Sequence, residues 1–228
     1  MIASKKRFFT ALGILAVFTA LLVIMFLPLF NGQNMLRNID ELYNSISKGS
    51  ANYLSEVRET SEECVGISID TSIDMESQEQ AEQTALLYEG CGAEAVVSGD
   101  RMDISGDLGH NLATAVGDAE KLYGNNRDEL SDKYGYDGLQ VMYNWHRSLV
   151  SLNDVLEREG MVSAAKAVAE VAEKGIEPAY NYFGIEPEKM SEKAGVVVGS
   201  LFFYVFYTVL WGFGIMYLFE AWGLKATH

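Results

Sequence analysis

The sequence predicts a mainly α-helical membrane protein, in which two transmembrane helices bracket an extracytoplasmic helical-bundle domain with a small β-α-β-β (α+β) insertion. Two apolar runs, residues 8–30 and 194–219, contain no Asp, Glu, Lys or Arg. The segment between them is strongly acidic, and most of it repeats apolar residues at helical spacing. Only residues 64–107 change to the two-residue period of β-strands.

The two apolar runs are long enough to cross a membrane. The first has 23 residues and the second 26, and about 20 apolar residues in a helix cross a ~30 Å hydrocarbon core. A cleaved signal peptide is the competing interpretation of the first run, but its apolar region would be about 7–15 residues long and end in an Ala-x-Ala-like site. This run is longer and closes on Leu27-Pro28-Leu29-Phe30, which favours an uncleaved anchor.

Basic residues beside the runs predict their orientation. Lys5, Lys6 and Arg7 precede the first run and Lys225 follows the second, and basic residues close to a span are retained in the cytoplasm. The sequence therefore predicts a two-pass protein of the cell membrane, with transmembrane helices at residues 8–30 and 194–219. Residues 1–7 and 220–228 are expected to be cytoplasmic, and residues 31–193 extracytoplasmic.

The charge of the chain is concentrated in the predicted outer domain. The whole chain has 17 Lys plus Arg against 32 Asp plus Glu, and residues 31–193 hold 31 of the acidic residues and 13 of the basic ones. This balance excludes binding to the phosphate backbone of nucleic acid, which needs clustered Lys and Arg. The acidic surface is either a solvated face that keeps the domain soluble or a docking face for a basic extracytoplasmic protein.

The outer domain is expected to begin with a helix over residues 35–57 that continues the first span outward. Apolar residues recur there near helical spacing, with an interruption at Gly49 and Ser50. They are Leu36, Ile39, Tyr43, Ile46, Tyr53, Leu54 and Val57.

The insertion is predicted to have the order β-α-β-β. Val65, Ile67 and Ile69 alternate with small or polar residues, which indicates a strand. Ser77 is a suitable N-cap for the next helix. Two further strands, over residues 95–98 and 102–105, are joined by Gly99-Asp100, a pair suited to a tight hairpin. The sheet is expected to be packed on one side by its helix.

Three amphipathic helices are predicted beyond residue 107. Their apolar stripes cover residues 112–122, 139–156 and 162–176, and glycine-containing segments separate them. The tetrapeptide Gly-Ile-Glu-Pro occurs at residues 175–178 and 184–187, and since Pro suits the first turn of a helix, each copy is expected to restart one. From Pro187 a helix can run without a further breaker into the second span.

Cys64 and Cys91 flank the first predicted strand and its helix. In an oxidising extracytoplasmic space such an isolated pair commonly forms a disulfide, which would stabilise the domain by roughly 3–4 kcal/mol. The sequence therefore predicts a bridge between them. Two independent thiols are the alternative, and a redox-active pair is disfavoured because the spacing is not Cys-x-x-Cys.

Neither a metal site nor a catalytic centre is predicted. The spacing of Asp70, Ser72, Asp74 and Glu76 resembles the start of a calcium loop, but position six is not Gly and position twelve is not Glu, so we reject an EF-hand; looser calcium binding by the aspartates stays open. The outer histidines, His110 and His146, are expected on helices, without a motif for nucleophilic catalysis or for a bound cofactor.

The apolar runs themselves carry an interaction signal. Small residues four apart let helices approach closely within a membrane, and tyrosine hydroxyls deep in an apolar span prefer a hydrogen-bond partner. These features predict an interface with another protein, and exposure of the aromatic residues to lipid is the alternative. The predicted interface residues are Ala16, Ala20, Gly195, Gly199, Tyr204 and Tyr207.

These features favour a non-catalytic, membrane-anchored accessory or structural subunit of a membrane protein complex. Such a subunit would dock partners, or copies of itself, through its acidic outer domain and its transmembrane helices. The runner-up is an extracytoplasmic ligand-binding or sensory module that signals to a separate protein through the spans. An enzyme of the outer membrane face is the least favoured of the three.

Overall fold

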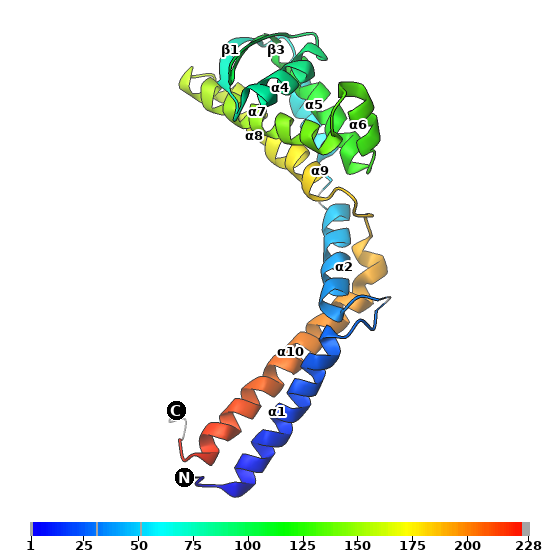
Figure 1. The fold of residues 1–228 in the computed structure, drawn as a ribbon, viewed down its shortest axis with the longest axis vertical. Helices are drawn as coiled ribbons and strands as arrows, with labels where there is room; N and C mark the ends of the chain where they lie inside the picture. Colours follow the sequence, from blue (N-terminus) through cyan, green and yellow to red (C-terminus); the bar gives the residue numbers. More distant parts are fainter. Residues whose placement is uncertain (1, 31, 51, 225–228) are drawn as a thin grey trace. The chain divides into compact units, whose positions relative to one another are not determined.

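The computed structural model describes residues 2–30, 32–50 and 52–224, so Lys225, on which the topology prediction relies in part, lies outside the described residues. The chain divides into two compact units (Figure 1). We call residues 1–49 together with 187–228 the apolar unit, and residues 50–186 the acidic unit. Each unit is described separately below.

The apolar unit contains both predicted apolar helices, α1 (Lys5–Phe26) and α10 (Met190–Ala221). Each is long and apolar enough to cross a membrane, and only 6% of its most apolar 18-residue stretch is buried. A core helix of a soluble protein would bury most of this surface. As predicted, the helix that follows Pro187 runs through the second apolar run without a break.

The first helix ends at Phe26 because of Pro28. A proline disfavours helical backbone in the residue before it, and Leu27 is extended, with φ −73° and ψ 145°. A separate helix, α2 (Met35–Ser50), follows, and then α3 (Leu54–Glu63). The predicted outward continuation of the first span as one helix over residues 35–57 is therefore wrong. Gly49 and Ser50, where an interruption was predicted, are the last two residues of α2.

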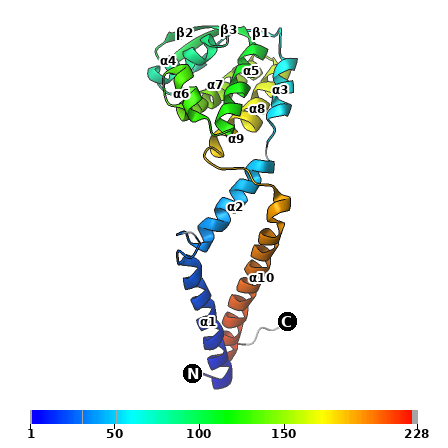
Figure 2. The same ribbon diagram turned by 90° about the vertical axis from the view of Figure 1, so that its right-hand side faces the viewer.

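Helices α1 and α10 lie side by side and antiparallel (Figure 2). At Gly214 the two helices are so close that an added Cβ would lie 2.7 Å from Leu15 Cδ2. The ring of Phe18 stacks on Tyr207, with centroids 4.3 Å apart. An ion pair of 3.2 Å joins Arg7 to Glu220. The first apolar helix thus packs along the second within the same chain.

A small antiparallel sheet forms one layer of the acidic unit. Its strands β1 (Ser68–Asp74), β2 (Glu94–Ser98) and β3 (Arg101–Asp107) are ordered β1-β3-β2, and α4 (Gln78–Glu89) connects the first two. Ser77 caps α4 by accepting from the Gln80 amide, as predicted. Gly99 has the left-handed φ of +69° that a type II′ hairpin turn requires at its first position. The predicted β-α-β-β order is confirmed, but β1 starts at Ser68, three residues later than expected.

Helices of the acidic unit pack on one face of this sheet (Figure 2). Side chains of β1 and β3 alternate between buried and exposed along each strand, so the other face is open. As predicted, α4 packs on the sheet, and α5 (Leu108–Tyr123) and α7 (Gly138–Arg158) contact it as well. The helical layer is completed by α3, α6 (Arg127–Tyr134), α8 (Val162–Val171) and α9 (Glu177–Asn181). The core between the layers is continuous and centres on Tyr88, Leu112 and Trp145.

The three predicted amphipathic helices correspond to α5, α7 and α8. A short π-helical segment, Ala172–Ile176, joins α8 to α9. Because helical backbone continues through it, the first Gly-Ile-Glu-Pro copy does not restart a helix, contrary to expectation. The second copy ends shortly before α10 begins at Met190.

Candidate functional site

The four small residues predicted to form an interface are not used in the contact between α1 and α10. Ala16 and Ala20 are exposed. A Cβ added at Gly195 or Gly199 would meet no described atom within 4 Å. Any close approach at these positions would therefore involve another molecule.

The close approach within the chain occurs at Gly214 instead, which the sequence analysis missed. A search for small residues four apart overlooks it, because Leu210 and Leu218 occupy the positions one turn away on either side. Gly212, two residues before it, was an available hint, but an added Cβ there would be in open space among the described residues.

Tyr204 and Tyr207 differ in their surroundings. The Tyr207 ring is held by Phe18 and also stacks at 6.0 Å on Phe203, whereas 66% of Tyr204 is exposed. Neither hydroxyl makes a hydrogen bond to any described residue. Both side chains line the same cavity of the apolar unit.

This cavity, which we call the apolar groove, has a volume of about 480 Å³. Residues of α1, α2 and α10 line it, among them Phe18, Met25, Ile39, Leu201, Tyr207 and Trp211. Its polar wall atoms include the Tyr43 hydroxyl and Ser200 Oγ, which lie 3.0 Å apart and bond to each other. The Thr208 hydroxyl donates to the Tyr204 carbonyl oxygen at 2.8 Å. The groove therefore offers an almost entirely apolar surface.

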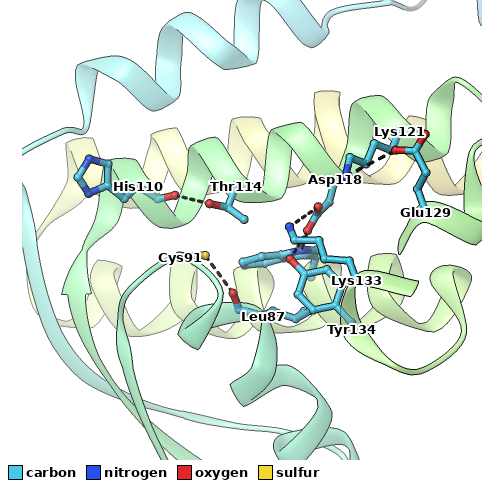
Figure 3. Close-up of polar contacts among 10 residues, drawn as sticks. Leu87, Cys91, His110, Thr114, Asp118, Lys121, Glu129, Lys133 and Tyr134 are labelled. Carbon is cyan, nitrogen blue, oxygen red and sulfur yellow. Dashed lines mark hydrogen bonds and ion pairs between the residues drawn. The ribbon is translucent and has the colours of Figure 1, made fainter. Parts of the chain in front are cut away.

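Asp118 is the centre of a polar cluster inside the acidic unit (Figure 3). It is 1% exposed, and its carboxylate accepts from Lys133 Nζ at 2.8 Å, from the Tyr134 hydroxyl at 2.6 Å and from Trp145 Nε1 at 3.0 Å. Burial, together with the hydrogen bond to Asp118, raises the pKa of Tyr134. These hydrogen bonds join α5 to α6 and α7. Because three donors already bind the carboxylate, Asp118 is poorly placed to react with a substrate.

The predicted disulfide between Cys64 and Cys91 is not present, and both residues are free thiols. Cys91 lies just after the end of α4, and its thiol donates to the carbonyl oxygen of Leu87 in that helix at 3.0 Å (Figure 3). Cys64 follows the last residue of α3 and is buried in the core. Burial raises the pKa of Cys64 and that of Cys91, the latter to about 11, so both thiols are poor nucleophiles at neutral pH.

No group of three or more His, Cys, Asp or Glu side chains is placed to hold a metal ion among residues 2–30, 32–50 and 52–224. The residues that resemble the start of a calcium loop lie on or just after β1. A strand spaces alternate residues almost 7 Å apart, so Asp70 and Asp74 do not converge on one point. His110 lies in the first turn of α5 and His146 lies in α7.

The open face of the sheet is acidic. Strand register brings together on it Asp70 and Asp74 of β1, Glu94 of β2, and Asp103 and Arg101 of β3. Asp103 accepts from the Ser72 hydroxyl and lies 3.7 Å from Arg101. We call these residues the acidic sheet face, whose four carboxylates and one guanidinium give it a formal charge of −3. The sequence analysis predicted an acidic surface on the outer domain, and the strand register shows which carboxylates share this face.

A polar depression of the acidic unit lies against α7 and α9. Two adjoining hollows of about 360 and 350 Å³ share Tyr143 and Tyr180, and His146 lines one of them. The Tyr143 hydroxyl donates to Glu76 Oε1 at 3.1 Å, and Arg147 lies 3.0 Å from the same oxygen. Of the side chains that line the hollows, Tyr143, His146 and Tyr180 carry polar groups that could hydrogen-bond a small polar ligand.

Three kinds of surface are thus available for an interaction: the outward faces of α1 and α10 with the apolar groove, the acidic sheet face, and the polar depression. No protein-family model, curated protein or solved structure matches this chain. A function therefore has to be argued from these surfaces and from the contacts that the chain leaves unused.

Proposed function

We propose that this protein is a non-catalytic, membrane-anchored accessory subunit of a membrane protein complex. In this proposal α1 and α10 cross the cell membrane, both termini are cytoplasmic and the acidic unit is extracytoplasmic. The apolar surfaces of the two helices and the basic residues Lys5, Lys6 and Arg7 support this arrangement. The occupied polar groups around Asp118 support a structural rather than a catalytic role for the acidic unit.

One observation carries the proposal: four small residues of the two apolar helices are not used in the contact between them. Ala16 and Ala20 form one small-residue step on α1, and Gly195 and Gly199 form another on α10, and neither step contacts the other helix closely. Small side chains favour helix association in a membrane because they let backbones approach. The partner that fits these positions is a helix of another membrane protein or of a second copy.

Two glycine substitutions on α10 test this proposal. Gly199→Leu adds bulk where the chain itself offers no contact within 4 Å among the described residues, so it should dissociate the complex without unfolding the subunit. Gly214→Leu should instead separate α1 from α10, because Leu15 occupies the space that the new side chain needs. Gly199→Ala is the matched control, since it changes helix propensity by a similar amount with little added bulk.

The measurement is purification from membranes in a mild detergent, followed by native mass spectrometry of the assembled fraction. We expect loss of a stoichiometric partner, or of a second copy, with Gly199→Leu and its retention with Gly199→Ala. Assembly that is unaffected by Gly199→Leu and by a matching Ala16→Leu change would refute helix-mediated assembly. Release of the wild-type chain from membranes by alkaline carbonate would refute the membrane anchoring itself.

The acidic sheet face supplies the second docking surface in this proposal. A formal charge of −3 on an open surface would speed encounter with a basic partner, and salt would weaken that steering. Asp70→Asn combined with Asp103→Asn should slow association measured at low ionic strength. The matched control is Glu79→Gln with Glu82→Gln on exposed positions of α4, which removes the same charge elsewhere; equal effects of the two pairs would argue against a specific face.

A ligand-binding or sensory module is the second candidate, and the polar depression favours it. Tyr143, His146 and Tyr180 are grouped around hollows large enough for a small polar molecule. A stoichiometric small molecule in native mass spectra of the purified chain, lost with Tyr180→Ala, would support this function over the first. Spectra of chain that carries only protein partners would count against it.

A further inference from the structure

The apolar groove is larger than an ordinary packing defect, and one side of it is open. Its volume of about 480 Å³ lies within the range of ligand pockets, roughly 300–1,000 Å³. Helices α1 and α10 form two walls and α2 forms the third, and Figure 2 shows these three helices. A molecule that fills the groove would add dispersion contacts to its aromatic walls.

We propose that the apolar groove binds an acyl chain of an outer-leaflet phospholipid. This inference rests on the proposed membrane anchoring of α1 and α10. The lipid would be a resident part of the apolar unit, wedged between the apolar face of α2 and the two membrane helices.

The dimensions favour a single hydrocarbon chain over a partner helix. Along α10 the groove extends from Ser200 to Trp211, a length of about 17 Å at 1.5 Å per residue. A helix of that length, about 10 Å wide with its side chains, occupies roughly 1,300 Å³. A helix could therefore insert only its side chains into this groove of about 480 Å³, whereas a single hydrocarbon chain can lie along it.

The level of the groove matches one leaflet. Leu15 lies against Gly214, and Phe18 lies against Trp211. Continuing this antiparallel register brings the end of α1, Phe26, level with Phe203. The groove therefore starts near the outer end of the paired helices and extends inward to Phe18, as an acyl chain extends from the headgroup region.

Polar groups near the outer end can select the lipid. The Tyr43 hydroxyl and Ser200 Oγ bond to each other, but the Tyr204 hydroxyl has no partner among the described residues. The register places it one residue inward of the level of Phe26, where α1 ends. Tyr204 is thus nearer the membrane surface than the apolar run alone suggested, and its hydroxyl can donate to an ester carbonyl. This bond matters because hydrocarbon burial alone gives no preference for the groove over the surrounding lipid.

The test uses the full chain in phosphatidylcholine vesicles. A minor fraction of this lipid carries a photoreactive group at the end of one acyl chain. After irradiation, mass spectrometry locates the crosslinks. We expect the strongest labelling at the inner end of the groove, on Phe18, Thr208 and Trp211. Labelling there should exceed labelling of Val209, which is at a similar depth on α10, is 47% exposed and does not line the groove.

Two variants of similar exposure on one face of α10 provide the control. Leu201 lines the groove and is 55% exposed, whereas Val205 is 57% exposed and does not line it. Leu201→Trp should reduce labelling of Trp211 to the level of Val209, and Val205→Trp should leave it unchanged. Ile39→Trp fills the groove from α2 and repeats the test if Leu201→Trp lowers the helix content measured by circular dichroism.

Tyr204→Phe addresses the headgroup contact. It should lower the amount of phosphatidylcholine retained in native mass spectra by about threefold, the effect of one average hydrogen bond in a membrane. Equal labelling of Trp211 and Val209, insensitivity to both groove-filling variants, or a protein segment crosslinked inside the groove would overturn the proposal. Carbonate extraction separates the two hypotheses: a chain that stays in the membrane but shows no groove labelling refutes only the lipid site.

Discussion

Removing the Asp118 carboxylate should destabilise the acidic unit more than the loss of one hydrogen bond. In Asp118→Ala the Tyr134 hydroxyl and Trp145 Nε1 both lose their acceptor, and both residues are buried. Leaving a buried polar group unsatisfied costs about 1–3 kcal/mol, so two such groups cost roughly 2–6 kcal/mol. Lys133 adds little, because its side chain is 34% exposed and can turn to water.

The assay is urea unfolding of the full chain in mild detergent, followed by tryptophan fluorescence. Replacing Trp211 and Trp222 by Phe leaves Trp145 as the only tryptophan, and its indole bonds to Asp118 directly. The fluorescence change therefore reports on the acidic unit. The free energy of unfolding is obtained from the dependence on urea concentration.

Two further variants calibrate the result. The Tyr134 hydroxyl and Trp145 Nε1 both donate to Oδ2 of Asp118. The one acceptor oxygen that Asp118→Asn keeps can therefore serve both, and this variant should lose much less stability than Asp118→Ala. Glu129→Ala removes an exposed carboxylate that lies 3.7 Å from Lys121 on the same helix pair and should cost at most about 0.5 kcal/mol. If Asp118→Ala unfolds with the same free energy as Glu129→Ala, the cluster is not a stabilising element and the reasoning fails.

Three other predictions concern the acidic unit. Gly109→Ala should prevent stable folding, because the added Cβ would lie 2.4 Å from a backbone nitrogen of the turn after α3. In the same helix, the Cβ added by Gly117→Ala meets no described atom within 4 Å, so this change should stabilise the protein by about 0.5–1 kcal/mol. Urea unfolding measures the effect of both substitutions. The backbone amide of His110 donates to the carboxylate of Asp107, the N-cap of α5, and lowers the pKa of that carboxyl from its ordinary value of 3.8. The contribution of this cap to the free energy of unfolding is therefore complete above about pH 4 and is lost as the pH falls through the lowered pKa. Unfolding measured from pH 5 to pH 3 should show that loss in the wild type and not in Asp107→Ala. Without reductant, both cysteines should alkylate rapidly in urea and slowly in the native chain, and resistance to alkylation in urea would reveal a disulfide.

Local patterns were sufficient to predict much of the fold. The two apolar helices follow from runs without charge, and the β-α-β-β order follows from a change of period together with Ser77 and Gly99. These signals act over a few residues, because caps and hairpin turns are satisfied by their neighbours in sequence. The end of α2 at Gly49 and Ser50 could be predicted for the same reason.

Features that depend on distant residues could not be predicted in this way. The contact of Gly214 with Leu15 requires knowledge of the antiparallel register, and the acidic sheet face requires the pairing of three strands. Helix α6 has only Leu130 and Tyr134 buried, so its sequence has no apolar stripe. Pro28 already indicated that the first helix ends before it. The prediction of a helix continuing outward gave more weight to the helical spacing of the apolar residues beyond the proline.

The acidic sheet face also bears on how the sheet avoids unwanted association. Within the described chain, β3 is the central strand and pairs with both β1 and β2. The outer edges of β1 and β2 therefore have no strand partner among the described residues. Such edges can add a strand from another copy, and charged side chains along them oppose this. Asp70 and Asp74 on one edge strand and Glu94 on the other would repel their counterparts in an approaching copy. Neutralising these carboxylates should therefore expose a tendency to form intermolecular sheets, especially at high protein concentration.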